Sequence, residues 1–228
     1  MMYRSHARRF LGLFFVLVLV GITSGCASPT KMTIDVAIDS VPQPQSPRAT
    51  VVITEVVDAR TFGPTNPDRS QPQLITGGEH DPSVTARSLG QFTTAGGAPF
   101  WDFLLPANRT VADLVREALE SAFHEAGIAV VHSPEDGAIP ITAEIIHFWS
   151  WNTGSWTFKF HFLADVNIMG QLSPFEAGET VQGTVMLQSA VAGSARGYVN
   201  TNTKGIQNFV ENVRERIRDA EGSDFDLE

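Results

Sequence analysis

From about residue 131 to residue 191, apolar and polar residues alternate with a period of two, and this alternation limits the possible folds more than any other feature. Side chains of a strand point alternately to its two faces, so the region is predicted to form strands that each carry one apolar face. A turn is expected at residues 152–154. The apolar stripes are Ile141, Ala143, Ile145, His147 and Trp149; Trp156, Phe158, Phe160, Phe162, Ala164, Val166 and Ile168; and Val181, Gly183, Val185, Leu187, Ser189 and Val191. They predict an antiparallel meander with one buried face.

Two other segments repeat with the period of a helix. Thr110 and Asp113 have the spacing of a capping box, and apolar residues then recur every three or four positions over residues 111–126. A second amphipathic helix is predicted over residues 203–220. Helices that cover one face of a sheet define the α+β class. We therefore expect a mainly antiparallel sheet of about four to six strands with two amphipathic helices packed on one face.

The N-terminal segment, residues 1–25, has the pattern of an export signal. Three arginines precede an apolar run over residues 10–22, which is shorter than the roughly 20 residues that a transmembrane helix needs. Ser24 and Gly25 stand directly before Cys26, the single cysteine of the chain. This arrangement resembles the lipobox of bacterial lipoproteins. The alternatives are an ordinary signal peptide followed by an unmodified cysteine, and a permanent membrane helix.

The lipobox resemblance implies cleavage after Gly25 and acylation of Cys26, with palmitate-like chains that anchor the protein to a membrane. Two or more acyl chains make such an anchor stable. The residue after the cysteine is Ala27 and not Asp, which in this class of lipoprotein implies the outer membrane of a cell with two membranes, facing the periplasm. In a cell with one membrane, the implied location is the extracytoplasmic face of that membrane.

The remainder of the chain is predicted to contain a tether and one domain. Residues 26–48 are rich in Pro and Ser and are interpreted as a tether with one short strand. A single α+β domain is expected over residues 49–221, followed by an acidic tail at 222–228. Within the domain, residues 58–108 contain many Pro and Gly residues and are predicted to form a long loop.

The charge of the chain excludes one large class of partners. Its 16 basic and 25 acidic residues give a formal net charge of −9. The charged residues of the signal segment are all basic, so the rest of the chain is more acidic still. An acidic surface repels phosphate backbones and cannot gain from the release of their counterions. We therefore expect no nucleic-acid partner.

Motifs with a firm chemical mechanism are absent from the sequence, which holds no nucleophile elbow, phosphate-binding loop, dinucleotide fingerprint or zinc-protease helix. Residues 79–81, Glu-His-Asp, could hold a cation or supply a general base, but they are also typical of a solvated turn. His161 is interpreted as part of a cross-strand polar pair, and His147 as a core histidine. His124 and His132 have no partners at a useful spacing. We expect no catalytic site, no metal and no cofactor.

Aromatic residues and one Asp-x-Arg sequence are the remaining candidates for function. Trp149, Trp151 and Trp156 could contact a lipid or a protein partner, or could fill the core beneath the helices. Asp58 and Arg60 follow a predicted strand, where the arginine either is functional or pairs with an acid to fix the chain as it leaves that strand.

The order of a lipobox, a Pro-rich tether, a strand ending in Asp58-Ala59-Arg60, and a helix from Thr110 through Ala126-Gly127 into strands resembles the YajG-type bacterial lipoproteins. The resemblance implies an envelope lipoprotein with no assigned activity and no catalytic residues. Our first hypothesis is a non-catalytic interaction or accessory domain that binds another envelope component through its sheet edge, long loop or aromatic strand. The alternatives are a lipid or glycolipid carrier or outer-membrane assembly factor with an apolar groove, and a hydrolase of envelope polymers with its site at residues 79–81.

Overall fold

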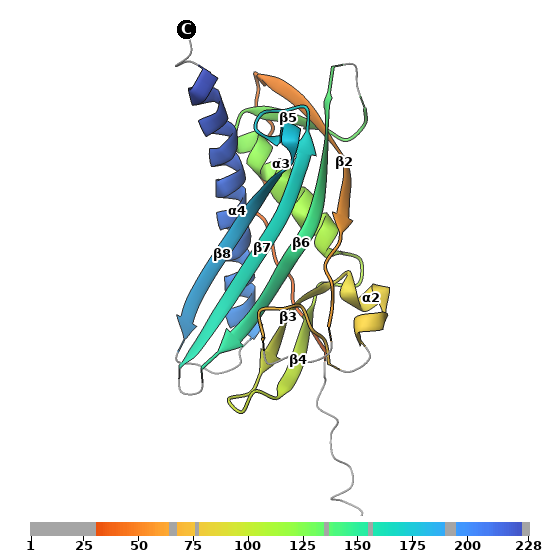
Figure 1. The fold of residues 1–228 in the computed structure, drawn as a ribbon, viewed down its shortest axis with the longest axis vertical. Coiled ribbons are helices and arrows are strands. Elements are labelled where there is room, and N and C mark those ends of the chain that lie inside the picture. The colour runs from red at the N-terminus through yellow and green to blue at the C-terminus, as the bar shows by residue number, and fades with distance from the viewer. Residues whose placement is uncertain are drawn as a thin grey trace, which may run out of the picture.

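The computed structural model describes residues 31–63, 68–75, 78–134, 137–154, 157–189 and 195–224. The α+β class is confirmed, because helices cover one side of a curled sheet (Figure 1). The strands are β1 (Lys31–Thr33), β2 (Ala49–Asp58), β3 (Ser88–Thr93), β4 (Pro99–Leu104), β5 (Ile128–Val131), β6 (Ile139–Thr153), β7 (Phe158–Gly170) and β8 (Glu179–Ser189). The helices are α2 (Pro82–Thr85), α3 (Val111–Glu125) and α4 (Ala195–Asp224), with short 3-10 turns η1 (Gly78–His80) and η2 (Phe175–Ala177). The signal segment and Cys26 lie outside the described residues.

The predicted antiparallel sheet of about four to six strands is wrong in size and in strand direction. The described residues form an eight-stranded mixed sheet with β6 as its shared strand. On one side of β6, β7 and β8 follow in antiparallel order, as predicted. On the other side, the first half of β6 pairs in parallel with β2 and its last part pairs in parallel with β3. The sheet therefore forks at β6, with β5 beyond β2 on one branch and β4 and β1 beyond β3 on the other.

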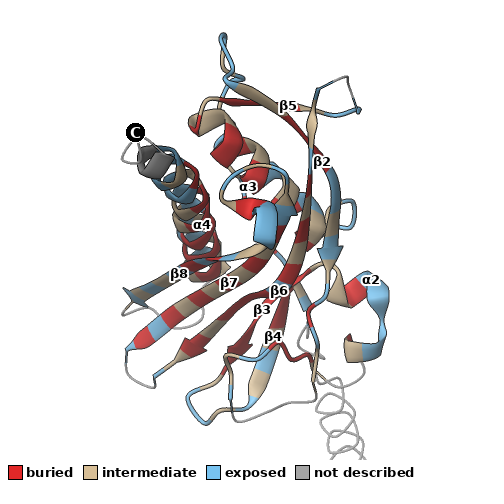
Figure 2. Cartoon of the chain, turned by 45° about the horizontal axis from the view of Figure 1, so that its top comes forward, coloured by how far each residue is buried: buried red, intermediate tan, exposed pale blue. Residues whose placement is uncertain are grey.

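The main core lies between the sheet and the two long helices, α3 and α4 (Figure 2). The apolar stripe predicted for β7 is confirmed from Phe158 to Ile168, and it faces these helices. At the start of α3 the predicted capping box is present: Asp113 N donates to Thr110 Oγ1 over 3.1 Å and Thr110 N donates to Asp113 Oδ2 over 2.8 Å. Helix α4 begins at Ala195, eight residues before the predicted start. None of the helices in the described ranges is both long enough and apolar enough to cross a membrane.

The interpretation of residues 26–48 as a tether is wrong from residue 31 onward. Strand β1 pairs in parallel with β4, and farther along the segment Ser121 Oγ of α3 donates to the Asp39 carbonyl oxygen over 3.3 Å. Ile34 and Val36 are buried in the main core, which gives this extended segment a hydrophobic reason to stay attached. The His124 ring adds a contact of 2.9 Å between its Nδ1 and the carbonyl oxygen of Val41.

The segment 58–108, predicted to be a long loop, contains β3, β4 and the short helix α2. Strand β3 is buried along its whole length because it lies between β4 and β6. A strand buried on both faces does not alternate in polarity, which is why the sequence pattern gave no sign of it.

Candidate functional site

The face of the sheet opposite α3 and α4, called the open face below, contains Trp149 and Trp151, two of the three tryptophans singled out by the sequence. A β-bulge in β6 determines which residues reach it. The pairing of β6 with β7 shifts between Ile145 and His147, so that Ile146 is an extra residue. Because one extra residue moves every later side chain to the other face, His147 and Trp149 do not share a face with Ile145. The single stripe predicted from Ile141 to Trp149 is therefore wrong beyond the bulge.

Trp149 lies on the open face but cannot be reached from solvent. Its side chain is fully buried in a second, smaller core with Leu74, Val84 and Leu104. The ring of Phe62 contacts it edge-on, with centroids 5.9 Å apart. The chain between β2 and β3 thus covers this part of the sheet, and Trp149 is excluded as a surface contact. Trp156, the third predicted contact residue, lies outside the described residues.

Trp151 lies beside an accessible part of the same face. Its ring stacks on the His161 ring across the β6–β7 pair, with centroids 5.1 Å apart and an interplanar angle of 11°. Met186, 54% exposed, stands opposite His161 on β8, so the three side chains form one row across three strands. Leu163 and Thr184 belong to the next row. Together these residues line a shallow open hollow of about 460 Å³.

The surroundings of this hollow favour the neutral form of His161. Burial lowers the pKa of His161 below its ordinary value, and the nearby Lys159 ammonium lowers it further. Its Nε2 lies 2.9 Å from the hydroxyl oxygen of Thr153. The sequence interpretation of His161 as a cross-strand polar partner agrees with this contact. A neutral ring stacked on an indole provides a flat and largely apolar surface.

Exposed apolar side chains gather on the open face. Among the described residues, the exposed large hydrophobic side chains are Val57, Phe100, Ile146, Met169 and Met186. Val57 and Met169 pair with polar residues of β6 that face away from the helices, and Ile146 is the bulge residue. Phe100 is not assigned to this face, because it is the extra residue of a bulge in β4 and its ring lies 6.4 Å from the ring of Phe92 in the main core. Such a concentration on one face is typical of an interaction surface.

His147 and Asp165 face each other on the open face, beneath residues 68–70. Burial lowers the pKa of His147, and the Asp165 carboxylate opposes this effect only in part. His147 Nε2 and Asp165 Oδ1 are both buried without a hydrogen-bond partner. The interpretation of His147 as a buried histidine agrees with its 9% exposure, although the core that holds it is not the one predicted.

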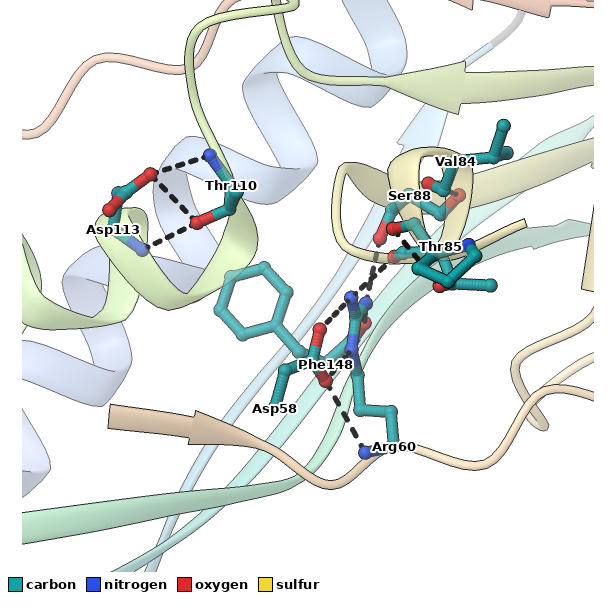
Figure 3. A network of polar contacts seen from close by, with 9 residues as sticks. Asp58, Arg60, Val84, Thr85, Ser88, Thr110, Asp113 and Phe148 are labelled. Atoms are coloured by element: carbon teal, nitrogen blue, oxygen red, sulfur yellow. Dashed lines mark hydrogen bonds and ion pairs between the residues drawn. The ribbon is translucent and has the colours of Figure 1, made fainter. Parts of the chain in front are cut away.

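Arg60 occupies the fork of the sheet (Figure 3). Its Nε and one terminal nitrogen bind the two oxygens of Asp58 at 2.8 and 2.7 Å. The other terminal nitrogen donates to the carbonyl oxygens of Ser88 and Phe148 at 2.7 and 2.9 Å. Between residues 145 and 150, β6 pairs with neither β2 nor β3. The Arg60 guanidinium therefore provides hydrogen bonds across the gap between the two branches. The Asp58–Arg60 pair therefore has the structural role that we considered from the sequence.

The Glu-His-Asp sequence at residues 79–81 does not form a converging site. The Asp81 carboxylate caps α2, where it accepts hydrogen bonds from Ser83 N at 2.9 Å and Ser83 Oγ at 2.7 Å. His80 is highly exposed and its Nε2 lies 3.8 Å from a Glu79 oxygen. Throughout the described ranges, no group of three or more His, Cys, Asp or Glu residues is arranged to hold a metal ion.

A buried polar cluster beneath the start of α4 was not predicted. The Tyr198 hydroxyl lies 2.7 Å from the Gln91 carbonyl oxygen and 2.9 Å from Asn152 Oδ1. Gln91 Nε2 also donates to the Asp102 carboxylate over 2.9 Å, and burial raises the pKa of that carboxyl group. The sequence signal was the pair of polar residues Ser150 and Asn152 near the end of a strand face that is apolar up to Phe148. The cluster joins β3, β4, β6 and α4.

Comparisons with known proteins do not assign the chain to a family. No family model matches it, and no curated protein matches it. Among solved structures, the chain is similar to protein XCC0632 from Xanthomonas campestris, a protein of the family model DUF330, with a TM-score of 0.44 and 10% identity over 86% of this chain and 99% of that chain. It is also similar to a second, uncharacterized protein, with a TM-score of 0.41 and 11% identity over 84% of this chain and 98% of that one. Similarities of this size carry no functional argument, and the resemblance to YajG-type lipoproteins stays a prediction.

Proposed function

We propose that the protein is a membrane-anchored envelope lipoprotein of the YajG type, and that its domain is a non-catalytic interaction module. Acylation of Cys26 would anchor it, and the open face would bind another envelope protein. The observation that carries this proposal is the set of exposed apolar side chains on the face opposite α3 and α4. Met186, Leu163 and the Trp151–His161 stack offer the type of surface that is enriched at protein interfaces.

A protein partner suits this surface better than a carried lipid. A carrier needs an enclosed apolar cavity that removes most of its ligand from water. The hollow beside Trp151 and the hollow between residues 37–39, α3 and α4 are open and mix polar with apolar side chains, and Trp149 is sealed inside the second core. The catalytic alternative has little support, because Asp81 caps α2 and His80 is exposed, so the residues at 79–81 do not converge.

Site-specific photo-crosslinking tests the proposal in cells of the native host. A photoreactive amino acid replaces Met186 on the open face, and a matched variant carries it at the exposed residue Glu215 on α4. We expect a discrete protein adduct from position 186, absent from position 215 and absent when Leu163→Lys is added. Equal adducts from both positions, or none from position 186, would contradict binding at this face. Intact-mass spectrometry of wild type and Cys26→Ala tests the acyl anchor separately.

A further inference from the structure

One end of the domain, called the hairpin end, has a charge opposite to that of the chain as a whole. It comprises the β3–β4 turn, the ends of β6 and β8, and the starts of β7 and α4. These parts meet around Asn152: its Oδ1 accepts from Thr93 N at 2.8 Å and lies 2.9 Å from the Tyr198 hydroxyl. The Arg69 guanidinium bridges them further, since it donates to the Asn152 carbonyl oxygen over 3.1 Å and lies against Gly97.

Basic residues dominate this end. Arg69, Lys159 and Arg196 fall within residues 68–71, 92–101, 151–154, 157–161, 186–189 and 195–199, and Lys159 and Arg196 are exposed. The one acid in these ranges is Asp68, whose carboxylate accepts hydrogen bonds from Ser70 N and Oγ. The protein has a formal net charge of −9, so its hairpin end is a local basic region on an acidic molecule.

Aromatic side chains accompany the basic groups. Phe100 is 38% exposed and its ring lies 4.4 Å from the ring of the half-buried Trp101. Both follow the β3–β4 turn directly. Aromatic rings next to Lys and Arg side chains are typical of the interface between a membrane and water, where rings enter the headgroup region and cations bind phosphates.

The path of the chain brings this end close to the proposed anchor. Strand β1 runs parallel to β4, with Lys31 opposite Asp102, so the chain enters the sheet from the side of the β3–β4 turn. Four residues lie between Cys26 and Lys31, so five Cα–Cα steps join the two positions. Five fully extended residues span at most about 18 Å. An acylated Cys26 would therefore hold the hairpin end near the bilayer, whereas the C-terminal end of α4 lies at the opposite end of the molecule (Figure 1).

We propose that the hairpin end contacts the headgroups of a bilayer that contains anionic phospholipids. Phe100 and Trp101 enter the interface, and Arg69, Lys159 and Arg196 bind lipid phosphates. Each basic residue at an anionic surface raises membrane binding on the order of fivefold at physiological salt. The position of the end next to the bilayer rests on the proposed acyl anchor, but the chemistry of the contact does not. The contact would orient the domain with its open face directed sideways toward a protein partner.

Depth-dependent quenching tests this contact on the full acylated protein in vesicles. Because Cys26 would be blocked by its acyl groups, Ala98→Cys in the exposed β3–β4 turn provides a single thiol for a fluorescent probe. The matched control is Glu215→Cys on α4. This position lies roughly 30 Å along the helix from its start at the hairpin end. Vesicles of phosphatidylcholine with and without phosphatidylglycerol, both containing brominated lipid, provide the quencher.

We expect bromolipid to quench the probe at position 98 at least threefold more than at position 215, and only when phosphatidylglycerol is present. Lys159→Glu with Arg196→Glu should abolish this difference, whereas Arg216→Glu with Arg218→Glu should preserve it. Equal quenching at both positions, or quenching at position 98 that neither anionic lipid nor charge reversal changes, would overturn the inference. The mass of the same sample reports whether Cys26 is acylated, so a failed anchor and a failed membrane contact give different results.

Discussion

Replacing Arg60 with Met removes the group that closes the fork of the sheet. The Met side chain has a similar length but no hydrogen-bond donor. The substitution leaves the buried carbonyl oxygens of Ser88 and Phe148 without the donor that Arg60 provides. It also removes the bidentate partner of Asp58 and the donor to the Thr85 carbonyl oxygen at 2.9 Å.

The expected loss follows from these contacts. Leaving one buried acceptor unsatisfied costs about 1–3 kcal/mol, and removing one member of a buried ion pair costs about 3–5 kcal/mol. The Arg60 side chain has 0% exposure, but Asp58 keeps 19% and can regain water. We therefore expect the free energy of unfolding to fall by about 3–5 kcal/mol for Arg60→Met. Arg60→Lys should lose nearly as much, since an ammonium cannot reach acceptors spread around a planar guanidinium.

Urea unfolding followed by tryptophan fluorescence measures this loss. Arg216→Met is the matched control, because Arg216 forms an exposed ion pair with Glu179 and should change stability by less than about 1 kcal/mol. A cost for Arg60→Met no larger than that of the control would refute the argument that the guanidinium closes the sheet. A free energy of unfolding for Arg60→Lys equal to that of the wild type would refute the argument that the planar guanidinium is needed.

Three further predictions concern packing, capping and protonation. Gly205→Ala should cost about 1–3 kcal/mol in urea unfolding because its methyl group would overlap the Phe162 ring, whereas Gly63→Ala, with no atom nearby, should be close to neutral. Thr110→Ala removes the side-chain acceptor of the α3 cap and should cost about 1 kcal/mol, read as a lower melting temperature. Burial lowers the pKa of His147 in the folded state, so this histidine takes up its proton at a higher pH in the unfolded chain than in the folded one. The free energy of unfolding should therefore fall as the pH drops from about 7 to 5. His147→Gln should reduce this pH dependence.

Local sequence signals predicted the elements whose structure depends on local contacts. The Thr110–Asp113 capping box lies within one helical turn and was found as predicted. The stripe of β7 was also predicted, because its alternation is unbroken and one face packs under α4. The pair Asp58–Arg60 is separated by one residue, which made an ion pair between them a natural hypothesis.

Features that depend on distant residues could not be predicted in this way. The bulge at Ile146 has no signal of its own, since Ile145 and Ile146 are both apolar and either could belong to the stripe. Helix α4 starts early because Tyr198 and Asn202 find buried partners on β3 and β6, and an isolated sequence does not show those partners. The exclusion of Trp149 from the surface likewise depends on Leu74, which is 75 positions away.

The shared strand β6 makes the order of folding depend on a late part of the chain. Val51 of β2 pairs with Ile139, and Gly90 of β3 pairs with Ser150, so both branches wait for the same strand. Parallel pairs with such wide sequence separation form slowly, because a long loop must close before any contact stabilises it. During synthesis or export from the N-terminus, the apolar strand β2 emerges well before β5 and β6, its two partners. Chains that stop before residue 139 could pair β2 with β5 and β3 with β4, but they would lack the strand that joins the two branches into one sheet.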